Sequence, residues 1–264
     1  MKKTILYFLF IALVTSCTKR IEIEPKPGEQ KVVIQAFLYN DSICEVTIAK
    51  TTGFLSTTKP PRLTGATVTL ADNVGNSEVL TYNPTKQSYE GATITGVINR
   101  TYTLTVEVEG NTYTAVSVLP ELYKADSIAA YYSSGSLFEE EGWYVKFYGE
   151  DDPSKADYYL IKGYSNDTLL NSNTEINFSD DRFLSQNVNG IDLGYKYDPG
   201  DMARVDMFSL TKEAYDFYYA ASTQLTSDGG FFSTPPANTP SNFNNGAVGF
   251  FQCSTRKPLY TTIP

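Results

Sequence analysis

The sequence predicts a mostly β protein, with an N-terminal immunoglobulin- or fibronectin-like β-sandwich at residues 31–120 and a C-terminal β-rich domain at residues 121–264. Short runs of alternating apolar and polar residues, separated by turn residues, recur about every 8 to 12 residues, as is typical of a sandwich. Aromatic residues make up 14% of the chain and charged residues only 19%, which favours ordered strands over disorder. One segment, about 212–226, has helical spacing instead.

The beginning of the chain has the pattern of a secretory signal. Residues 1–16 start with a methionine and two lysines and continue with an apolar run at 5–14 that is too short to span a bilayer. The sequence Leu-Val-Thr-Ser-Cys at 13–17 resembles the lipobox of bacterial lipoproteins, in which the cysteine receives diacylglycerol and becomes the acylated N-terminus. We therefore expect a signal peptide at 1–16 and lipidation of Cys17. The alternative is a plain secretory signal with an incidental cysteine.

Residues 17–30 are polar and contain prolines, so they are predicted to form a lipidated tether between the membrane and the first strand. Removal of the signal takes two lysines away and makes the net charge two units more negative than the −9 of the full chain. Affinity for nucleic acid depends on clustered Lys and Arg, and the chain has a pI near 4.6. We therefore expect membrane contact through the lipid and no nucleic-acid partner.

Turn residues separate the predicted strands of the first domain. The clearest alternation is at 101–109, where Tyr102, Leu104 and Val106 face one way and threonines face the other. Pro120 interrupts the last run and marks the predicted boundary. The predicted strands are residues 32–38, 43–48, 66–71, 101–109 and 112–118.

The second domain is again β but richer in aromatic residues. Thr211 can cap the helix at about 212–226, with Glu213 in the first turn and apolar residues at helical spacing behind it. The loop at 229–245 that follows is rich in Gly, Pro and Asn and is longer than compact domains usually contain. The predicted strands are residues 128–132, 143–148, 158–164, 175–178, 191–197, 203–210 and, last, 247–253.

Aromatic side chains are the candidates for a contact surface. The loop 229–245 contains Phe231, Phe232 and Phe243 among small and polar residues, and Trp143 belongs to a series of adjacent aromatic pairs. Adjacent residues of a strand face opposite sides, so half of each pair could be exposed and bind a sugar or a partner protein. The alternatives are that the loop only covers the C-terminal sheet and that the pairs pack on both faces of a sandwich.

The complete absence of histidine excludes several catalytic mechanisms. Without imidazole there is no Ser-His-Asp or Cys-His nucleophile and no His-ligated zinc site, and the sequence has no phosphate-binding glycine loop. Acid–base candidates are the carboxylates at 139–141, 151–152 and 180–181 and those of Asp198 and Asp201, but nothing pairs two of them across a substrate. We nominate no catalytic residue, metal ligand or cofactor, while calcium in an Asp-rich turn stays an alternative.

Two cysteines remain after the predicted processing, Cys44 and Cys253. In an oxidising envelope they could form a disulfide. As a free thiol, each would be an ordinary small residue of the core. The sequence leaves both alternatives open.

Three parts of the chain carry a resemblance to a known family. They are Cys17, 22–24 and 31–36, then 65–68 and 102–104, then 211–215 and 240–251. The C-terminal run Pro-Ser-Asn-Phe-Asn-Asn-Gly-Ala-Val-Gly-Phe-Phe is the most specific motif. Together these parts resemble the family of gram-negative envelope lipoproteins named domain of unknown function 4249. The resemblance implies an N-terminal immunoglobulin-like domain, a β-rich C-terminal domain and genes that often neighbour TonB-dependent outer-membrane receptors. It implies no established activity and no catalytic residues.

These observations predict an outer-membrane lipoprotein that acts as a non-catalytic accessory binding or assembly component, beside a TonB-dependent receptor in nutrient uptake. One alternative is a carboxylate-dependent envelope glycosidase. Another is a cell-surface adhesion module that binds through residues 31–120. The sequence leaves open whether the protein faces the periplasm or the medium.

Overall fold

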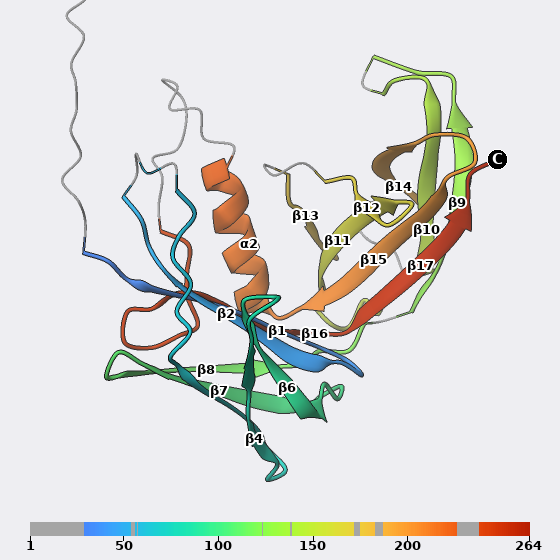
Figure 1. The fold of residues 1–264 in the computed structure, drawn as a ribbon. Helices are drawn as coiled ribbons and strands as arrows, with labels where there is room; N and C mark the ends of the chain where they lie inside the picture. The colour runs from blue at the N-terminus through green and yellow to red at the C-terminus, as the bar shows by residue number, and fades with distance from the viewer. Residues whose placement is uncertain are drawn as a thin grey trace, which may run out of the picture.

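The computed structural model describes residues 29–53, 56, 58–122, 124–137, 139–171, 175–182, 187–225 and 238–264. The predicted signal peptide, Cys17 and most of the tether lie outside these residues. The described part is mostly β with one helix, as predicted (Figure 1). Across these ranges, no helix is both long and apolar enough to cross a membrane.

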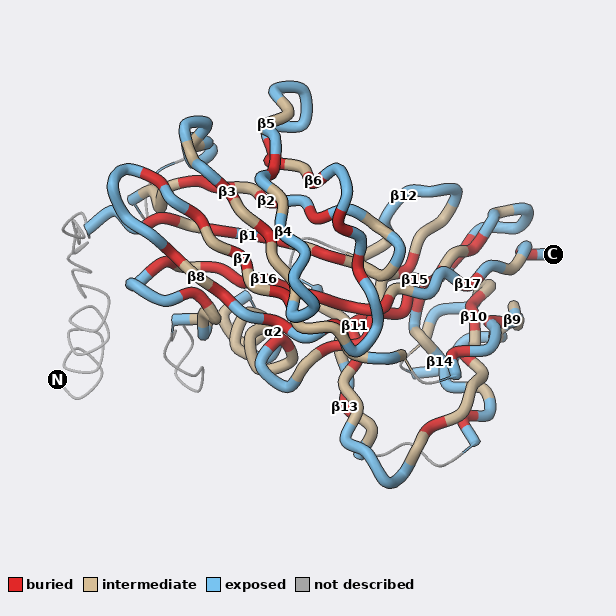
Figure 2. Tube along the Cα trace, turned by 90° about the horizontal axis from the view of Figure 1, so that it is seen from below, coloured by how far each residue is buried: buried red, intermediate tan, exposed pale blue. Residues whose placement is uncertain are grey.

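Two sheets pack face to face in what we call the first unit, with strand orders β16-β1-β2-β6-β5 and β4-β3-β7-β8. Alternation along β7 buries Tyr102, Leu104 and Val106 between the sheets, so a sandwich forms as predicted. Buried positions follow the inner strands of this unit (Figure 2). The strands are β1 (Val32–Tyr39), β2 (Ile43–Lys50), β3 (Thr67–Asp72), β4 (Ser77–Val79), β5 (Thr81–Asn83), β6 (Ser88–Thr95), β7 (Thr101–Val108), β8 (Asn111–Val118) and β16 (Val248–Ser254).

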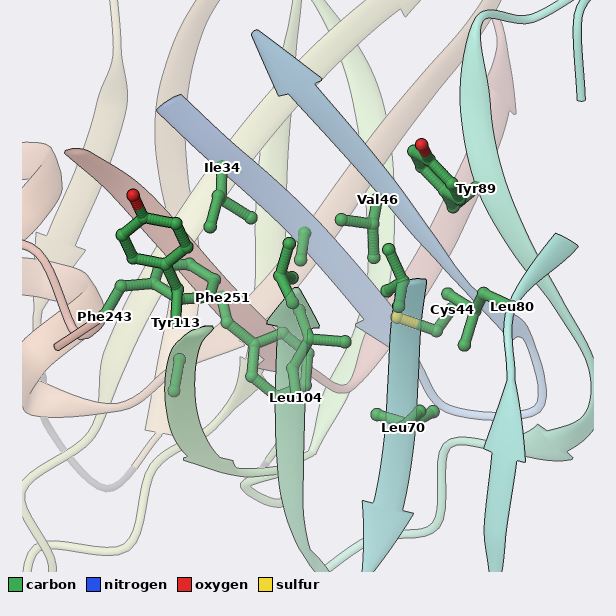
Figure 3. Packing of buried hydrophobic residues seen from close by; sticks show 14 of the residues in the cluster. Ile34, Cys44, Val46, Leu70, Leu80, Tyr89, Leu104, Tyr113, Phe243 and Phe251 are labelled. Carbon is green, nitrogen blue, oxygen red and sulfur yellow. The ribbon is translucent and has the colours of Figure 1, made fainter. Parts of the chain in front are cut away.

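A strand from the far end of the chain completes the first unit. β16 pairs in parallel with β1, with Phe251 opposite Ala36, and Phe251 is fully buried in the core of this unit (Figure 3). Gly249, at φ 110°, permits the close approach, because a Cβ there would collide with the carbonyl oxygen of Ile34. Residues 31–120 therefore do not contain the whole sandwich. Periodicity identifies a strand but not its partner.

In the second unit, the sheet β14-β10-β9 faces a sheet of order β12-β11-β15-β17, in which β13 also pairs with β11. Val145 of the first sheet and Met207 of the second contribute to the core between them. β17 lies beyond the last predicted strand and contains Pro258, which an edge strand tolerates. The strands are β9 (Ala125–Ser133), β10 (Gly142–Glu150), β11 (Tyr158–Ser165), β12 (Thr168–Leu169), β13 (Asn177–Asp180), β14 (Asn187–Tyr197), β15 (Met202–Leu210) and β17 (Arg256–Thr262).

The helix α2 (Lys212–Leu225) confirms the predicted helix and lies in the corner between the two units (Figure 1). Its Tyr215 ring lies 4.9 Å from the ring of Tyr158 in β11 of the second unit. Its Phe217 ring lies 5.1 Å from the ring of Phe250 in β16 of the first unit. The helix therefore packs against both units.

A buried ion cluster lies near the junction of the two units. Asp206 of β15 is only 1% exposed and pairs with Arg256 of β17 at 2.7 Å and with Arg204 at 3.4 Å. The backbone N–H of Arg256 donates to the side-chain oxygen of Asn40, just after β1, at 2.6 Å. β15 and β17 pair in the second unit, while the chain between them contributes β16 to the first unit. The two units are thus interlocked.

Candidate contact surface

The residues predicted to form a contact surface lie in different places. Phe231 and Phe232 are outside the described residues. Phe243 is only 6% exposed and packs in the core of the first unit beside Tyr113, so the prediction is wrong for this residue (Figure 3). Burying a phenylalanine ring stabilises the fold by roughly 1.5 to 3 kcal/mol, which favours the inward position. Trp143 is half-buried on β10 in the second unit.

The segment that contains Phe243 is held against β16 by an asparagine. The Asn242 side-chain amide donates to the carbonyl of Phe251 at 2.8 Å, and its oxygen accepts the N–H of Phe251 at 2.9 Å. This pair of hydrogen bonds fixes the direction of the chain just before Phe243. The ring therefore enters the core and not the solvent.

The next asparagines cover the edge strand β8. The Asn244 side-chain oxygen accepts the N–H of Thr114 at 2.7 Å, and the Asn245 amide donates to the carbonyl of Thr112 at 2.6 Å. Unpaired edge groups invite pairing with other chains, so this cover protects the sheet. The described end of the predicted loop, residues 238–245, is therefore a structural cover, but it covers β8 of the first unit and not the C-terminal sheet that the alternative predicts.

An exposed aromatic surface lies at the end of β9 and β10, which we call the distal hairpin (residues 131–137 and 139–144). Trp143 pairs with Tyr132 across the two strands, and their rings meet edge to face with centroids 5.3 Å apart. Tyr132 is 52% exposed, and Leu137 in the connecting turn is 95% exposed. Sequence reasoning missed Leu137, whose only signal is a large apolar residue in a polar turn. Solvent therefore reaches the Tyr132 ring at the end of β9 and the Leu137 side chain in the turn beyond it.

The opposite face of the distal hairpin is polar. The Tyr131 hydroxyl donates to the carboxylates of Asp192 and of Glu139, and the Lys146 ammonium lies 4.4 Å from the centre of the Tyr131 ring. Burial raises the pKa of Tyr131 far above its ordinary value, and the two hydrogen-bonded carboxylates raise it further. The phenol therefore stays protonated as a hydrogen-bond donor. On the other face, Trp143 packs against the core of the second unit, while Tyr132 beside it is exposed.

The adjacent tyrosines Tyr158 and Tyr159 pack on opposite sides of β11. Tyr158 contacts the helix α2, whereas Tyr159 is 7% exposed and its hydroxyl donates to Asp151 at 3.2 Å. Neighbouring strand residues alternate between faces, so each ring fills a different layer. For this pair, the two-sided packing is the correct interpretation.

A small apolar cavity lies between the sheets of the second unit. It measures about 90 Å³, and Phe147, Ile161, Val188 and Met207 are among the residues that line it. An engineered cavity of roughly 150 Å³ holds benzene, and ligand pockets usually reach roughly 300 to 1,000 Å³. This cavity is therefore too small for most metabolites, which favours the exposed aromatic surface as the site of recognition.

The family model described as Domain of unknown function (DUF4249) matches residues 18–258. The chain belongs to this family. No curated protein matches the chain. Because the match extends over both units, DUF4249 describes the interlocked pair and not the first sandwich alone.

Two of the carboxylates considered in the sequence have separate structural partners in this DUF4249 protein. Glu140 forms an ion pair with Lys196 at 2.7 Å at the base of the distal hairpin. Asp201 accepts the Ser165 hydroxyl at 2.5 Å, and this hydrogen bond holds the pKa of Asp201 below its ordinary value. Each of these carboxylates thus fixes a turn.

Asp151 differs from these surface carboxylates. It is 3% exposed, and burial raises its pKa. Asp157 also has a raised pKa, mainly because of burial and then because of the nearby Asp151 carboxylate. Among the described residues of this DUF4249 chain, no group of three or more acidic or cysteine side chains is placed to hold a metal ion.

Cys44 and Cys253 are both free and buried in the first unit. Leu38 lies opposite Cys253, and the register that pairs Phe37 with Glu45 also brings Leu38 opposite Cys44. With a strand between them, the two cysteines are about 10 Å apart at Cα, beyond the roughly 7 Å that a disulfide allows. Burial raises the pKa of both thiols, so they are inert core residues.

Proposed function

We propose that this DUF4249 protein is a lipoprotein anchored to the outer membrane through Cys17. It acts as a non-catalytic accessory component beside a TonB-dependent receptor in nutrient uptake. The observation that carries this proposal is the distal hairpin, where Tyr132, paired with the half-buried Trp143, and Leu137 in the connecting turn are exposed to solvent. Its function is recognition of a partner protein.

The position of the distal hairpin supports this role. β1 enters the fold at one end of the molecule, and β9 and β10 lie at the opposite end in both views (Figures 1 and 2). A chain tethered before β1 would therefore have its aromatic surface at the end away from the tether. Such an arrangement suits a component that reaches from its anchor to a neighbour.

The chemistry of the hairpin suits a protein partner. Trp and Tyr are enriched among the residues that contribute most to protein–protein binding. Tyr132 is already held by a hydrogen bond from its hydroxyl to Glu141 and by its contact with Trp143, so little side-chain freedom is lost on binding. The adjacent carboxylates form a polar rim, as is usual around such surfaces.

The test is recovery of partners from native membranes with the double variant Tyr132→Ala/Leu137→Ser. Both side chains are mostly exposed, so the fold should be kept, and recovery of an outer-membrane receptor should fall at least tenfold. The matched control is Tyr260→Ala/Leu169→Ser, which removes a tyrosine 57% exposed and a leucine 47% exposed elsewhere on the second unit. Equal recovery with both variants, or no receptor with the wild type, would contradict the proposal.

A further inference from the structure

The described lysines and arginines are nearly all engaged by other side chains. Most form an ion pair, and Lys146 and Lys162 lie over aromatic rings. Within the described ranges, the residues with neither kind of contact are Lys31, Lys59, Arg62 and Lys257. In an acidic protein, cations left without a carboxylate are unusual.

Two of these four cations, Lys59 and Arg62, line one hollow of the first unit, and the main chain of Lys31 lies beside it. The hollow measures about 530 Å³, and its lining includes Lys59 and Arg62, together with Lys50 at the end of β2. No carboxylate is among the described residues that line it. Lys31 adjoins the hollow through its main chain. Its backbone N–H donates to the hydroxyl of Thr51 at 3.0 Å, and Thr51 belongs to the lining. We call Lys31, Lys50, Lys59 and Arg62 the basic hollow.

Lys50 contributes less charge than the other three. Its ammonium pairs with Glu109 at 2.5 Å, so this cation is already neutralised. Arg62 and Lys59 line the hollow with no carboxylate partner among the described residues, and Lys31, whose main chain lies beside the hollow, has none either. Guanidinium binds phosphate with two parallel hydrogen bonds, and lysine binds it as a point charge. The hollow thus has the donors that a phosphate group requires.

The basic hollow lies where the chain enters the fold. Lys31 immediately precedes β1 and follows the predicted tether at 17–30. A random-coil chain as long as residues 17–30 would have a typical end-to-end distance of roughly 20 Å. If Cys17 is lipidated, the anchor keeps the hollow close to the membrane surface at all times.

We propose that the basic hollow binds the phosphate groups of anionic phospholipids at the membrane surface and so sets the orientation of the protein. This inference rests on the proposed lipid anchor at Cys17. The net negative charge of the chain does not prevent the contact, because charges beyond roughly 8 Å are largely screened at physiological salt. With the hollow on the membrane, the distal hairpin at the opposite end points away from it.

The test is flotation of the mature chain with Cys17→Ser, which removes the lipid, on vesicles of phosphatidylcholine with 30 mol% phosphatidylglycerol (about 30% anionic lipid). We expect binding to these vesicles and none to pure phosphatidylcholine. The variant Lys31→Gln/Lys59→Gln/Arg62→Gln should lower the partition coefficient roughly a hundredfold, from about fivefold for each cation near an anionic surface. The matched control Lys155→Gln/Lys212→Gln/Lys257→Gln changes the charge equally on the second unit and on α2, and should bind like the parent.

Two results would overturn the inference. One is equal binding of the two triple variants, which would make the effect one of net charge. The other is binding of free inorganic phosphate in the hollow, measured by calorimetry, without binding to anionic vesicles. Metabolic labelling of the wild-type chain with a radioactive fatty acid tests the anchor separately. If the wild-type chain incorporates no fatty acid but the Cys17→Ser chain still binds anionic vesicles, the lipid anchor is refuted and the phosphate site is not.

Discussion

The two units have the same β architecture but treat their polar groups differently. In the first unit, carboxylates such as Glu78 are held by hydrogen bonds that lower the pKa, and asparagines cover the edge strand β8. In the second unit, by contrast, burial raises the pKa values of Asp151 and Asp157. The second unit thus contains buried carboxylates whose ionisation costs stability, unlike the hydrogen-bonded carboxylate of Glu78 in the first unit.

The difference in carboxylates does not make the units independent. The core of the first unit includes Phe243, Phe251 and Cys253, which come from the last part of the chain. The strands on either side of β16 pair with each other in the second unit. A sandwich that looks complete between residues 31 and 120 therefore depends on a strand about 130 residues later, and we expect the two units to unfold together.

The largest expected effect is loss of folding of the fragment 31–120 by itself. Without β16, the fragment leaves the backbone edge of β1 unpaired and lacks the buried ring of Phe251. We expect circular dichroism of an unfolded or aggregated chain and no cooperative transition in urea. The control is the same fragment with residues 238–255 attached through a glycine–serine linker, which should recover the transition. A cooperative transition of 31–120 alone would contradict the dependence, and only then could that fragment test the adhesion alternative.

A smaller effect on stability is expected from a substitution that creates a cavity in the core of either unit. Phe251→Ala should lower the free energy of unfolding by about 3 to 5 kcal/mol, and Met207→Ala by about 2 to 5 kcal/mol, because each removes a buried side chain. If the units are interlocked, each variant shifts one common transition, seen both by tryptophan fluorescence from Trp143 in the second unit and by far-ultraviolet circular dichroism. Two separate transitions, with each variant shifting only one of them, would contradict the inference that the two units unfold together.

The sequence predicted the helix and most of the long strands, because such elements depend on neighbours along the chain, but it did not predict β4, β5 and β6. Thr211 accepts the N–H of Ala214 at 3.2 Å and begins the helix as expected. The alternation around Leu104 likewise identified β7. Parallel pairing of β16 with β1 depends on residues far apart in sequence, and no local pattern encodes it.

The candidate surface was harder to predict than the fold. Phe243 and Trp143 are both aromatic residues near turn residues, but hydrogen bonds from Asn242 turn the first inward. The C-terminal motif at residues 240–251 also has a structural role. Its asparagines cover β8, and its Gly249 lets β16 approach β1. A conspicuous motif can therefore serve the architecture and not a ligand.

The smallest expected effect concerns pH and distinguishes the carboxylates of the two units. Burial alone would raise the pKa of Glu78, but its carboxylate accepts the Thr93 hydroxyl and the N–H groups of Ala92, Thr93 and Ile94 at 2.8 to 3.1 Å, and these bonds lower the pKa. The stabilisation by Glu78 is therefore complete above its unfolded pKa of about 4.3 and is lost as the pH falls through the lower folded value. Glu78→Gln should cost about 2 kcal/mol at pH 7 and less towards acid.

Asp151 should show the opposite slope. Burial raises its pKa, and the nearby Asp181 and Asp152 carboxylates add to this against the hydrogen bond from Tyr159. Ionisation of the folded carboxylate therefore costs stability as the pH rises through the raised value, and Asp151→Asn removes that cost while it keeps an acceptor for Tyr159. In urea unfolding from about pH 2 to pH 8, the difference from wild type should become more favourable with pH for Asp151→Asn and less favourable for Glu78→Gln. Slopes of the same sign would show that the two units treat their carboxylates alike.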